Sequence, residues 1–135
     1  MEWITNLLSS LAKVLTPIFG MIIFLMRRKE VRAAKYAKIN QQHREGILLV
    51  LWYNPKEFDS RCIQSLQILS GAANLAEGFD KRVCKDIKDT ENKIQELRQN
   101  FGFLKNRDLT PKNREHFSEK NANINLCLMT KLNRI

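Results

Sequence analysis

The first 26 residues of this chain constrain its structure more than any other part. Residues 3–26 carry a single charge, on Lys13, and run directly into a basic triplet at 27–29. As an α-helix, this stretch would extend about 36 Å, which exceeds the membrane hydrocarbon core of about 30 Å. Trp3 suits an aromatic anchor at one membrane interface, and the basic triplet suits the other. The sequence therefore predicts a single transmembrane helix over residues 1–26.

The amino-terminal half of this stretch is polar for a helix that faces lipid. Only residues 14–26 are apolar nearly throughout, and this run is shorter than the roughly 17 residues that a span needs. A buried core helix and an amphipathic segment in the membrane interface are therefore alternatives. A cleaved signal peptide fits less well, because Glu2 precedes the apolar run and no small-residue cleavage site separates that run from the arginines.

The distribution of charge predicts the orientation of the span. Residues 27–44 hold seven basic residues against one acidic residue, whereas only Glu2 is charged before position 3. Because cytoplasmic flanks are rich in Lys and Arg, we expect the N-terminus outside and the C-terminus in the cytoplasm. The residues expected to bind anionic lipid headgroups are Arg27, Arg28, Lys29, Arg32, Lys35 and Lys38. These residues carry most of the net charge of +9. Binding of nucleic acid is therefore not needed to explain the basic composition.

Small residues recur every four positions within the predicted span. Ala12, Thr16 and Gly20 form a row that lets two helices approach closely in lipid. Lys13 lies beside this row, and an ammonium group inside a membrane usually faces a helix bundle or a water-filled cavity. We therefore predict a homo-oligomer packed through this row, around a lumen lined by Ser9, Lys13 and Thr16. Alternatively, Lys13 reaches the interface from a tilted helix and the row has no function.

Residues 27–53 are predicted to continue the spanning helix as a basic juxtamembrane stalk. The segment 30–42 contains no glycine or proline and is rich in helix-forming residues. Residues 47–53 are seven consecutive apolar residues, too few to cross a bilayer. A buried strand would fit this run, but the helical neighbours favour the buried end of the same helix.

Two further helices are predicted over residues 54–104, packed as a cytosolic hairpin or small bundle. The first begins at Asn54, which can form a capping box with Glu57, and it ends at Gly78. The second begins near Asp80. Apolar residues recur at spacings of three and four in both helices, and a short coiled coil is an alternative to packing within one chain. The expected packing positions are Leu66, Leu69, Val83, Ile87, Ile94 and Leu97.

Residues 105–135 differ in composition from the segment before them. They hold seven basic residues, repeated asparagines and few aliphatic side chains. This composition predicts a flexible Asn- and Lys-rich tail. A short helical turn is expected at most where Leu126, Met129 and Leu132 share a face. Binding of RNA or lipid by this tail is a minor alternative.

No pattern of residues indicates catalysis, a metal site or a cofactor. Cys62, Cys84 and Cys127 show neither a C-x-x-C motif nor a histidine at zinc-ligand spacing. His43 and His116 are the only imidazoles. They fall in the predicted stalk and tail, where no shielded environment is expected to tune a catalytic pKa. The sequence therefore predicts that the protein is not an enzyme and uses no metal or cofactor.

Two function classes are compatible with these features. The leading hypothesis is a small single-span membrane protein that self-associates through its N-terminal helix and forms a pore or membrane-perturbing effector. The alternative is a membrane-anchored adaptor whose cytosolic helices recruit a partner protein. An all-α architecture is expected in both cases, with a transmembrane helix, a cytosolic helical unit and a flexible tail.

Overall fold

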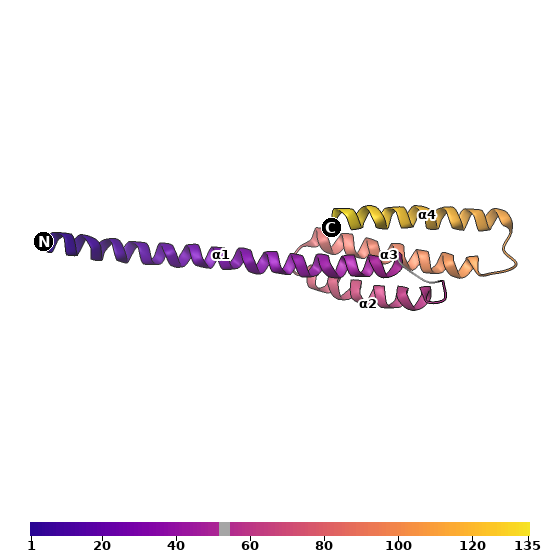
Figure 1. The fold of residues 1–135 in the computed structure, drawn as a ribbon, viewed down its shortest axis with the longest axis horizontal. Coiled ribbons are helices and arrows are strands. Elements are labelled where there is room, and N and C mark those ends of the chain that lie inside the picture. Colours follow the sequence, from indigo (N-terminus) through magenta and orange to yellow (C-terminus); the bar gives the residue numbers. More distant parts are fainter. Residues whose placement is uncertain (52–54) are drawn as a thin grey trace. The chain divides into compact units, whose positions relative to one another are not determined.

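The computed structural model of this chain describes residues 1–51 and 55–135, and the regular secondary structure in these ranges is helical. Four helices are present, and the described residues contain no strand: α1 (Glu2–Leu51), α2 (Phe58–Glu77), α3 (Lys81–Leu104) and α4 (Pro111–Arg134) (Figure 1). The prediction of an all-α fold is confirmed. The chain divides into two compact units, Met1–Ala37 and Lys38–Ile135, and helix α1 contributes residues to both.

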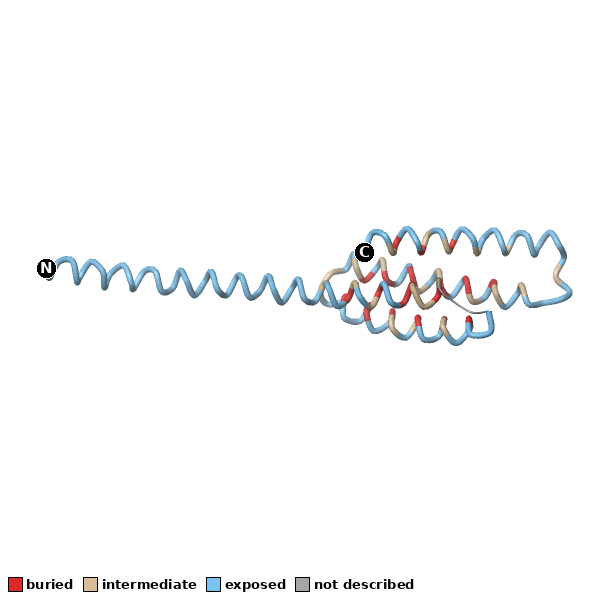
Figure 2. The backbone as a smooth tube through the Cα atoms, in the orientation of Figure 1, coloured by how far each residue is buried: buried red, intermediate tan, exposed pale blue. Residues whose placement is uncertain are grey.

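The first unit consists of one helix. All of its residues are exposed except Tyr36, which is half-buried, as the uniform colour of this segment in Figure 2 shows. This helix is long and apolar enough to cross a membrane, and the described residues contain no other such helix. The structure thus contains one candidate membrane helix near the N-terminus, as the sequence predicts.

The second unit has an apolar core made by the end of α1 together with α2, α3 and α4. The described part of the predicted 47–53 run continues α1, and Ile47 and Val50 are fully buried; residues 52 and 53 lie outside the described ranges. Gly46 is required by close packing, because a Cβ atom there would lie 2.7 Å from Cγ of buried Leu69. The Ser65 hydroxyl donates to the Gly46 carbonyl at 2.6 Å. Helix α2 therefore packs directly on the backbone of α1.

Helix α2 begins later than the sequence predicts. Residues 55–57 form a turn, and Glu57 occupies the N-cap position without a side-chain hydrogen bond to the helix. The Glu57 carboxylate instead forms an ion pair with Arg61 at 3.5 Å. Glu57 therefore does not act as the third helical residue of a capping box, and the predicted cap residue Asn54 lies outside the described ranges.

The boundary between α2 and α3 agrees with the prediction. Gly78 ends α2 with a negative φ of −89°. Asp80 caps α3, since its Oδ1 accepts hydrogen bonds from the backbone N–H groups of Arg82 at 2.9 Å and Val83 at 3.4 Å. Such a cap satisfies amide groups that have no partner within the helix, so α3 starts at a defined residue.

The C-terminal segment is a helix in the structure, and the prediction of a flexible tail is wrong. Thr110 caps α4 by accepting a hydrogen bond from the Asn113 backbone at 3.3 Å, and Pro111 follows the cap. The inward face of α4 carries Ile124, Leu128 and Lys131, all buried. A lysine in this row interrupts the apolar pattern, which is why composition alone indicates a tail.

The helical unit is a small bundle, one of the two predicted arrangements, and not a two-helix hairpin. Helix α3 contacts α2 on one side and α4 on another, and the end of α1 also packs against it (Figures 1 and 2). The apolar face predicted within residues 126–132 is not the face that packs on the core, because Leu126 and Met129 are 64% and 52% exposed. These two side chains point away from the core that Ile124 and Leu128 join.

Candidate functional site

The predicted helix-packing row lies open on α1. Ala12, Thr16 and Gly20 are all exposed, and a Cβ atom at Gly20 would meet no atom within 4 Å. The Thr16 hydroxyl donates to the Ala12 carbonyl at 2.7 Å, so its hydrogen-bonding capacity as a donor is used within the helix. The row therefore presents a smooth, narrow surface of the kind that permits close approach of a second helix in lipid.

A polar position lies next to this row. Pro17 is inside α1, and proline has no N–H group to donate to the carbonyl four residues earlier, which belongs to Lys13. The Lys13 side chain is exposed, as is that of Ser9. An ammonium group and a backbone carbonyl without its usual helical donor thus occur at the same residue. Both groups are costly to expose to lipid.

Most of the remaining surface of this helix before Arg27 is apolar. Its large side chains are 41–68% exposed, which leaves them without intramolecular packing. Such a contiguous apolar surface is not stable in water and indicates contact with lipid or protein. The large exposed apolar residues from the predicted interface anchor to the basic triplet are Trp3, Ile4, Leu7, Leu8, Leu11, Val14, Leu15, Ile18, Phe19, Met21, Ile22, Ile23, Phe24, Leu25 and Met26.

A buried polar cluster joins three helices in the second unit. Lys131 of α4 is 3% exposed, and its Nζ lies 2.8 Å from Asp86 Oδ1 and 2.8 Å from Asp89 Oδ2, both on α3. The same Nζ donates to the Thr90 hydroxyl at 3.1 Å. His43 of α1 completes the cluster, since its Nε2 lies 2.8 Å from Thr90 Oγ1. We call these five residues the lysine cluster.

The lysine cluster satisfies a charge that would otherwise be expensive to bury. Lys131 Nζ also approaches the Asp86 carbonyl oxygen at 3.0 Å, so three N–H donors face four acceptors. The Asp86 and Asp89 side chains remain 45% and 51% exposed. The hydrogen bond from Lys131 holds the pKa of the Asp89 carboxyl below its usual range. The cation is therefore buried while both counter-charges keep contact with water.

The electrostatics of His43 favour its neutral form. Burial lowers the pKa of its imidazole from 6.5 to about 4, with a further lowering by Lys131 and an opposing effect from Asp86. The Thr90 hydroxyl is 3.0 Å from the Asp86 carbonyl and can donate its proton there. With that arrangement, the imidazole donates from Nε2 to Thr90. His43 is then a neutral hydrogen-bond donor that does not bind a second proton near neutral pH.

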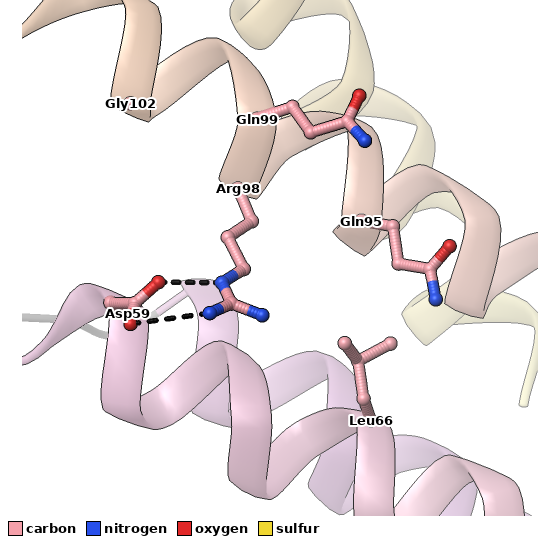
Figure 3. Close-up of a pocket in the computed structure, with 6 residues that line it drawn as sticks. All are labelled: Asp59, Leu66, Gln95, Arg98, Gln99 and Gly102. Carbon is pink, nitrogen blue, oxygen red and sulfur yellow. Dashed lines mark hydrogen bonds and ion pairs between the residues drawn. The ribbon is translucent and has the colours of Figure 1, made fainter.

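A shallow groove between α2 and α3 is lined by polar side chains (Figure 3). The Arg98 guanidinium donates to both carboxylate oxygens of Asp59, at 2.5 Å and 3.4 Å. These hydrogen bonds hold the pKa of the Asp59 carboxyl below its usual range. Gln95 and Gln99 lie along the same wall, with Leu66 opposite (Figure 3). Because the charges are paired and exposed, this groove resembles a solvated helix seam.

The positions expected to pack in the helical unit differ in burial. Leu69, Ile87, Ile94 and Leu97 are buried, whereas Leu66 and Val83 are half-buried. The residues predicted to lie at the membrane surface are all exposed: Arg27, Arg28, Lys29, Arg32, Lys35 and Lys38.

The cysteines and histidines do not gather into one site. Cys62 and Cys84 are buried, and burial raises the pKa of the Cys62 thiol to about 11, so that it stays protonated. Cys127 is half-buried on α4. His116 contacts Phe117 at a ring-centroid distance of 5.7 Å and lies outside the lysine cluster.

Sequence reasoning missed the lysine cluster, although one signal was available. Lys131 follows Ile124 and Leu128 at helical spacing, and the pair Asp86 and Asp89 lies on one face of the preceding helix. Only the antiparallel packing of α3 and α4 brings them together. No family model, no curated protein and no solved structure matches this chain.

Proposed function

We propose that this chain is a single-span membrane protein that self-associates through the N-terminal half of α1 and forms a pore or membrane-perturbing assembly. The observation that supports it is the exposed helix of the first unit. Covering one large apolar side chain contributes about 1.5–3 kcal/mol, and this helix presents such side chains along its whole apolar stretch. A lipid bilayer covers all of them at once.

The polar side of the same helix supports self-association over a lone anchor. A lone anchor would expose Lys13, the carbonyl that Pro17 leaves without a donor, and the row ending at Gly20 to lipid. In an oligomer, close approach at Ala12 and Gly20 turns Lys13 toward neighbouring copies or enclosed water. Polar groups within a membrane are usually placed in this way.

The proposed oligomer predicts distinct effects for two kinds of substitution. Gly20→Ile or Ala12→Ile should shift the detergent-solubilised complex toward monomer, because the added side chain separates the helix backbones. Lys13→Leu should preserve insertion and abolish dye leakage from vesicles that contain the protein, because it removes the polar lumen group. Complex mass from light scattering and release of a trapped dye measure the two effects.

Phe19→Ile is the matched control, because it changes an exposed apolar residue outside the small-residue row. It should leave both mass and leakage unchanged. If none of the substitutions changed the mass of the complex or the rate of dye leakage, the pore hypothesis would be contradicted. The helix would then act only as a membrane anchor.

The proposed orientation places the helical unit in the cytoplasm. It rests on the basic segment 27–38, which is exposed and suited to anionic headgroups. A membrane-impermeant thiol reagent applied to intact cells should therefore leave Cys127 unlabelled. After permeabilisation, the half-buried Cys127 should react ahead of Cys62 and Cys84, which are buried. Labelling of Cys127 in intact cells would reverse the orientation.

A membrane-anchored adaptor is the second candidate, and one feature of the helical unit favours it. An apolar groove between the end of α1 and α2 is lined by Leu48, Leu49 and Ile68, with Glu45 and Arg61 also on its wall. A partner helix with an aliphatic face suits such a groove. If Ile68→Asp abolished binding of a partner protein and left the mass of the detergent-solubilised complex unchanged, the result would favour the adaptor.

A further inference from the structure

The contact between α4 and α3 is unusually polar for a helix pair in a small protein. Helix α4 buries two apolar side chains, Ile124 and Leu128, and its third buried residue is Lys131. By comparison, α2 buries six apolar side chains and one serine. Apolar burial is the main source of helix docking free energy, so α4 is held less by the hydrophobic effect than α2 is.

Buried amide groups weaken the same contact. Within the described ranges, Asn100 Nδ2 on α3 has no hydrogen-bond partner, nor do Asn121 Oδ1 and Asn125 Oδ1 on α4. A buried polar atom without a partner loses its bonds to water and gains none in return. Undocking of α4 would rehydrate the two asparagine oxygens that α4 itself carries, which offsets part of the cost of separating the two helices.

The lysine cluster is consequently the specific attachment of α4. Its acceptor side on α3, formed by Asp86, Asp89 and Thr90, keeps two half-exposed carboxylates that stay hydrated when α4 leaves. Its donor side is the ammonium group of Lys131, which enters water on release. Both halves of the attachment are therefore stable apart, and each is complementary to the opposite half on any other copy of the chain.

The connection between α3 and α4 is short and locally held. Arg114 donates from Nη1 to the Leu104 carbonyl at 2.8 Å and from Nη2 to the Asn106 carbonyl at 3.0 Å. These bonds are exposed, so water can replace them. A short hinge that opens favours exchange of the helix it carries with an identical chain.

We propose that α4 exchanges between copies of this protein, with Lys131 of one copy bound by Asp86, Asp89 and Thr90 of a second copy. This inference rests on the proposed self-association, which brings two helical units onto one membrane patch and raises their effective concentration. The exchanged contact is identical to the contact within one chain. Exchange therefore costs only the opening of the hinge.

Two full-length variants test the exchange by complementation. The donor variant, Asp86→Asn with Asp89→Asn, keeps a normal α4 and lacks the acceptor carboxylates. The receiver variant, Leu128→Asp, keeps the acceptor and cannot dock its own α4, because position 128 is fully buried. Each variant alone should show rapid hydrogen exchange in α4 while α2 stays protected. If the Leu128→Asp protein also loses hydrogen-exchange protection in α2, the Lys131→Glu protein is used as the receiver variant instead.

Reconstituting both variants into the same vesicles should restore the hydrogen-exchange protection of α4 in the donor variant. Its amides should exchange roughly tenfold more slowly than in the donor alone, which corresponds to about 1.4 kcal/mol of docking free energy. The two α4 segments differ in sequence, so mass spectrometry of peptides assigns the protection to the donor. Variants reconstituted separately and then mixed should show no restoration.

The outcomes separate this inference from the proposed function. A mixed complex of oligomeric mass without restored protection would overturn the exchange and leave self-association intact. A monomeric mass without restored protection would overturn both. Slow hydrogen exchange in α4 of the donor variant by itself would show that docking does not need the acceptor carboxylates, which again contradicts the exchange.

Discussion

Ile94→Asp should abolish the folded structure of the helical unit. Ile94 is fully buried in the hydrophobic core. Burying a carboxylate without a partner costs several kcal/mol, and a domain of this size has a total stability of only about 5–15 kcal/mol. We expect loss of hydrogen-exchange protection in α2, α3 and α4 of the detergent-solubilised protein, together with loss of its thermal transition.

Ile63→Asp is the matched control for this substitution. It introduces the same carboxylate on α2, at a side chain that is 41% exposed. Because water reaches that position, the stability of the unit should change by less than about 1 kcal/mol. Equal melting temperatures for wild type and Ile94→Asp would contradict the packing of α3 described above.

Acidification from pH 7 to pH 5 should destabilise the helical unit through His43 by about 2 kcal/mol. Burial lowers the pKa of His43 in the folded state to about 4, against 6.5 for the exposed imidazole. Above pH 6.5 both states hold a neutral imidazole, so the stability is fully present there. As pH falls below 6.5, the unfolded state binds a proton that the folded state refuses, and stability is lost progressively until about pH 4.

His43→Gln isolates this effect, because glutamine can donate to Thr90 and does not titrate. Other groups also contribute to the pH dependence: the pKa of Asp59 and Asp89 is lowered, and burial raises the pKa of Glu91. These contributions are shared by wild type and variant. The free energy of unfolding, measured with urea at each pH, should therefore have a shallower pH slope in the variant.

His116→Gln serves as the control, because His116 is exposed on α4 and lies outside the lysine cluster. This variant should retain the wild-type pH slope. If His43→Gln had the same slope as wild type, the imidazole would not be shielded from water in the folded state.

Local patterns in the sequence predicted the elements that need no distant partner. The candidate membrane helix follows from the apolar run before residue 27, since its length and composition meet the requirement of a bilayer without reference to other segments. The cap at Asp80 and the end at Gly78 are also local, because each depends on the backbone within one helical turn. Helix type and approximate boundaries could thus be derived from neighbouring residues.

Tertiary structure decided whether the C-terminal segment packs as a helix and which polar residues are buried in the core. The aliphatic content of residues 105–135 alone does not indicate a packed helix. The segment packs on the core because Ile124 and Leu128 join it and because Lys131 meets Asp86 and Asp89, residues more than 40 positions away in the chain. The same holds for His43. Its position in a basic segment indicated exposure to solvent, but in the structure it is buried and its Nε2 lies within hydrogen-bond distance of Thr90. The sequence by itself determined the candidate membrane helix and the helical character of the described residues before position 105, since these depend on local periodicity and composition. Only the packing of α1, α3 and α4 decided which charges are buried, because the free energy of a buried charge depends on partners that distant segments supply.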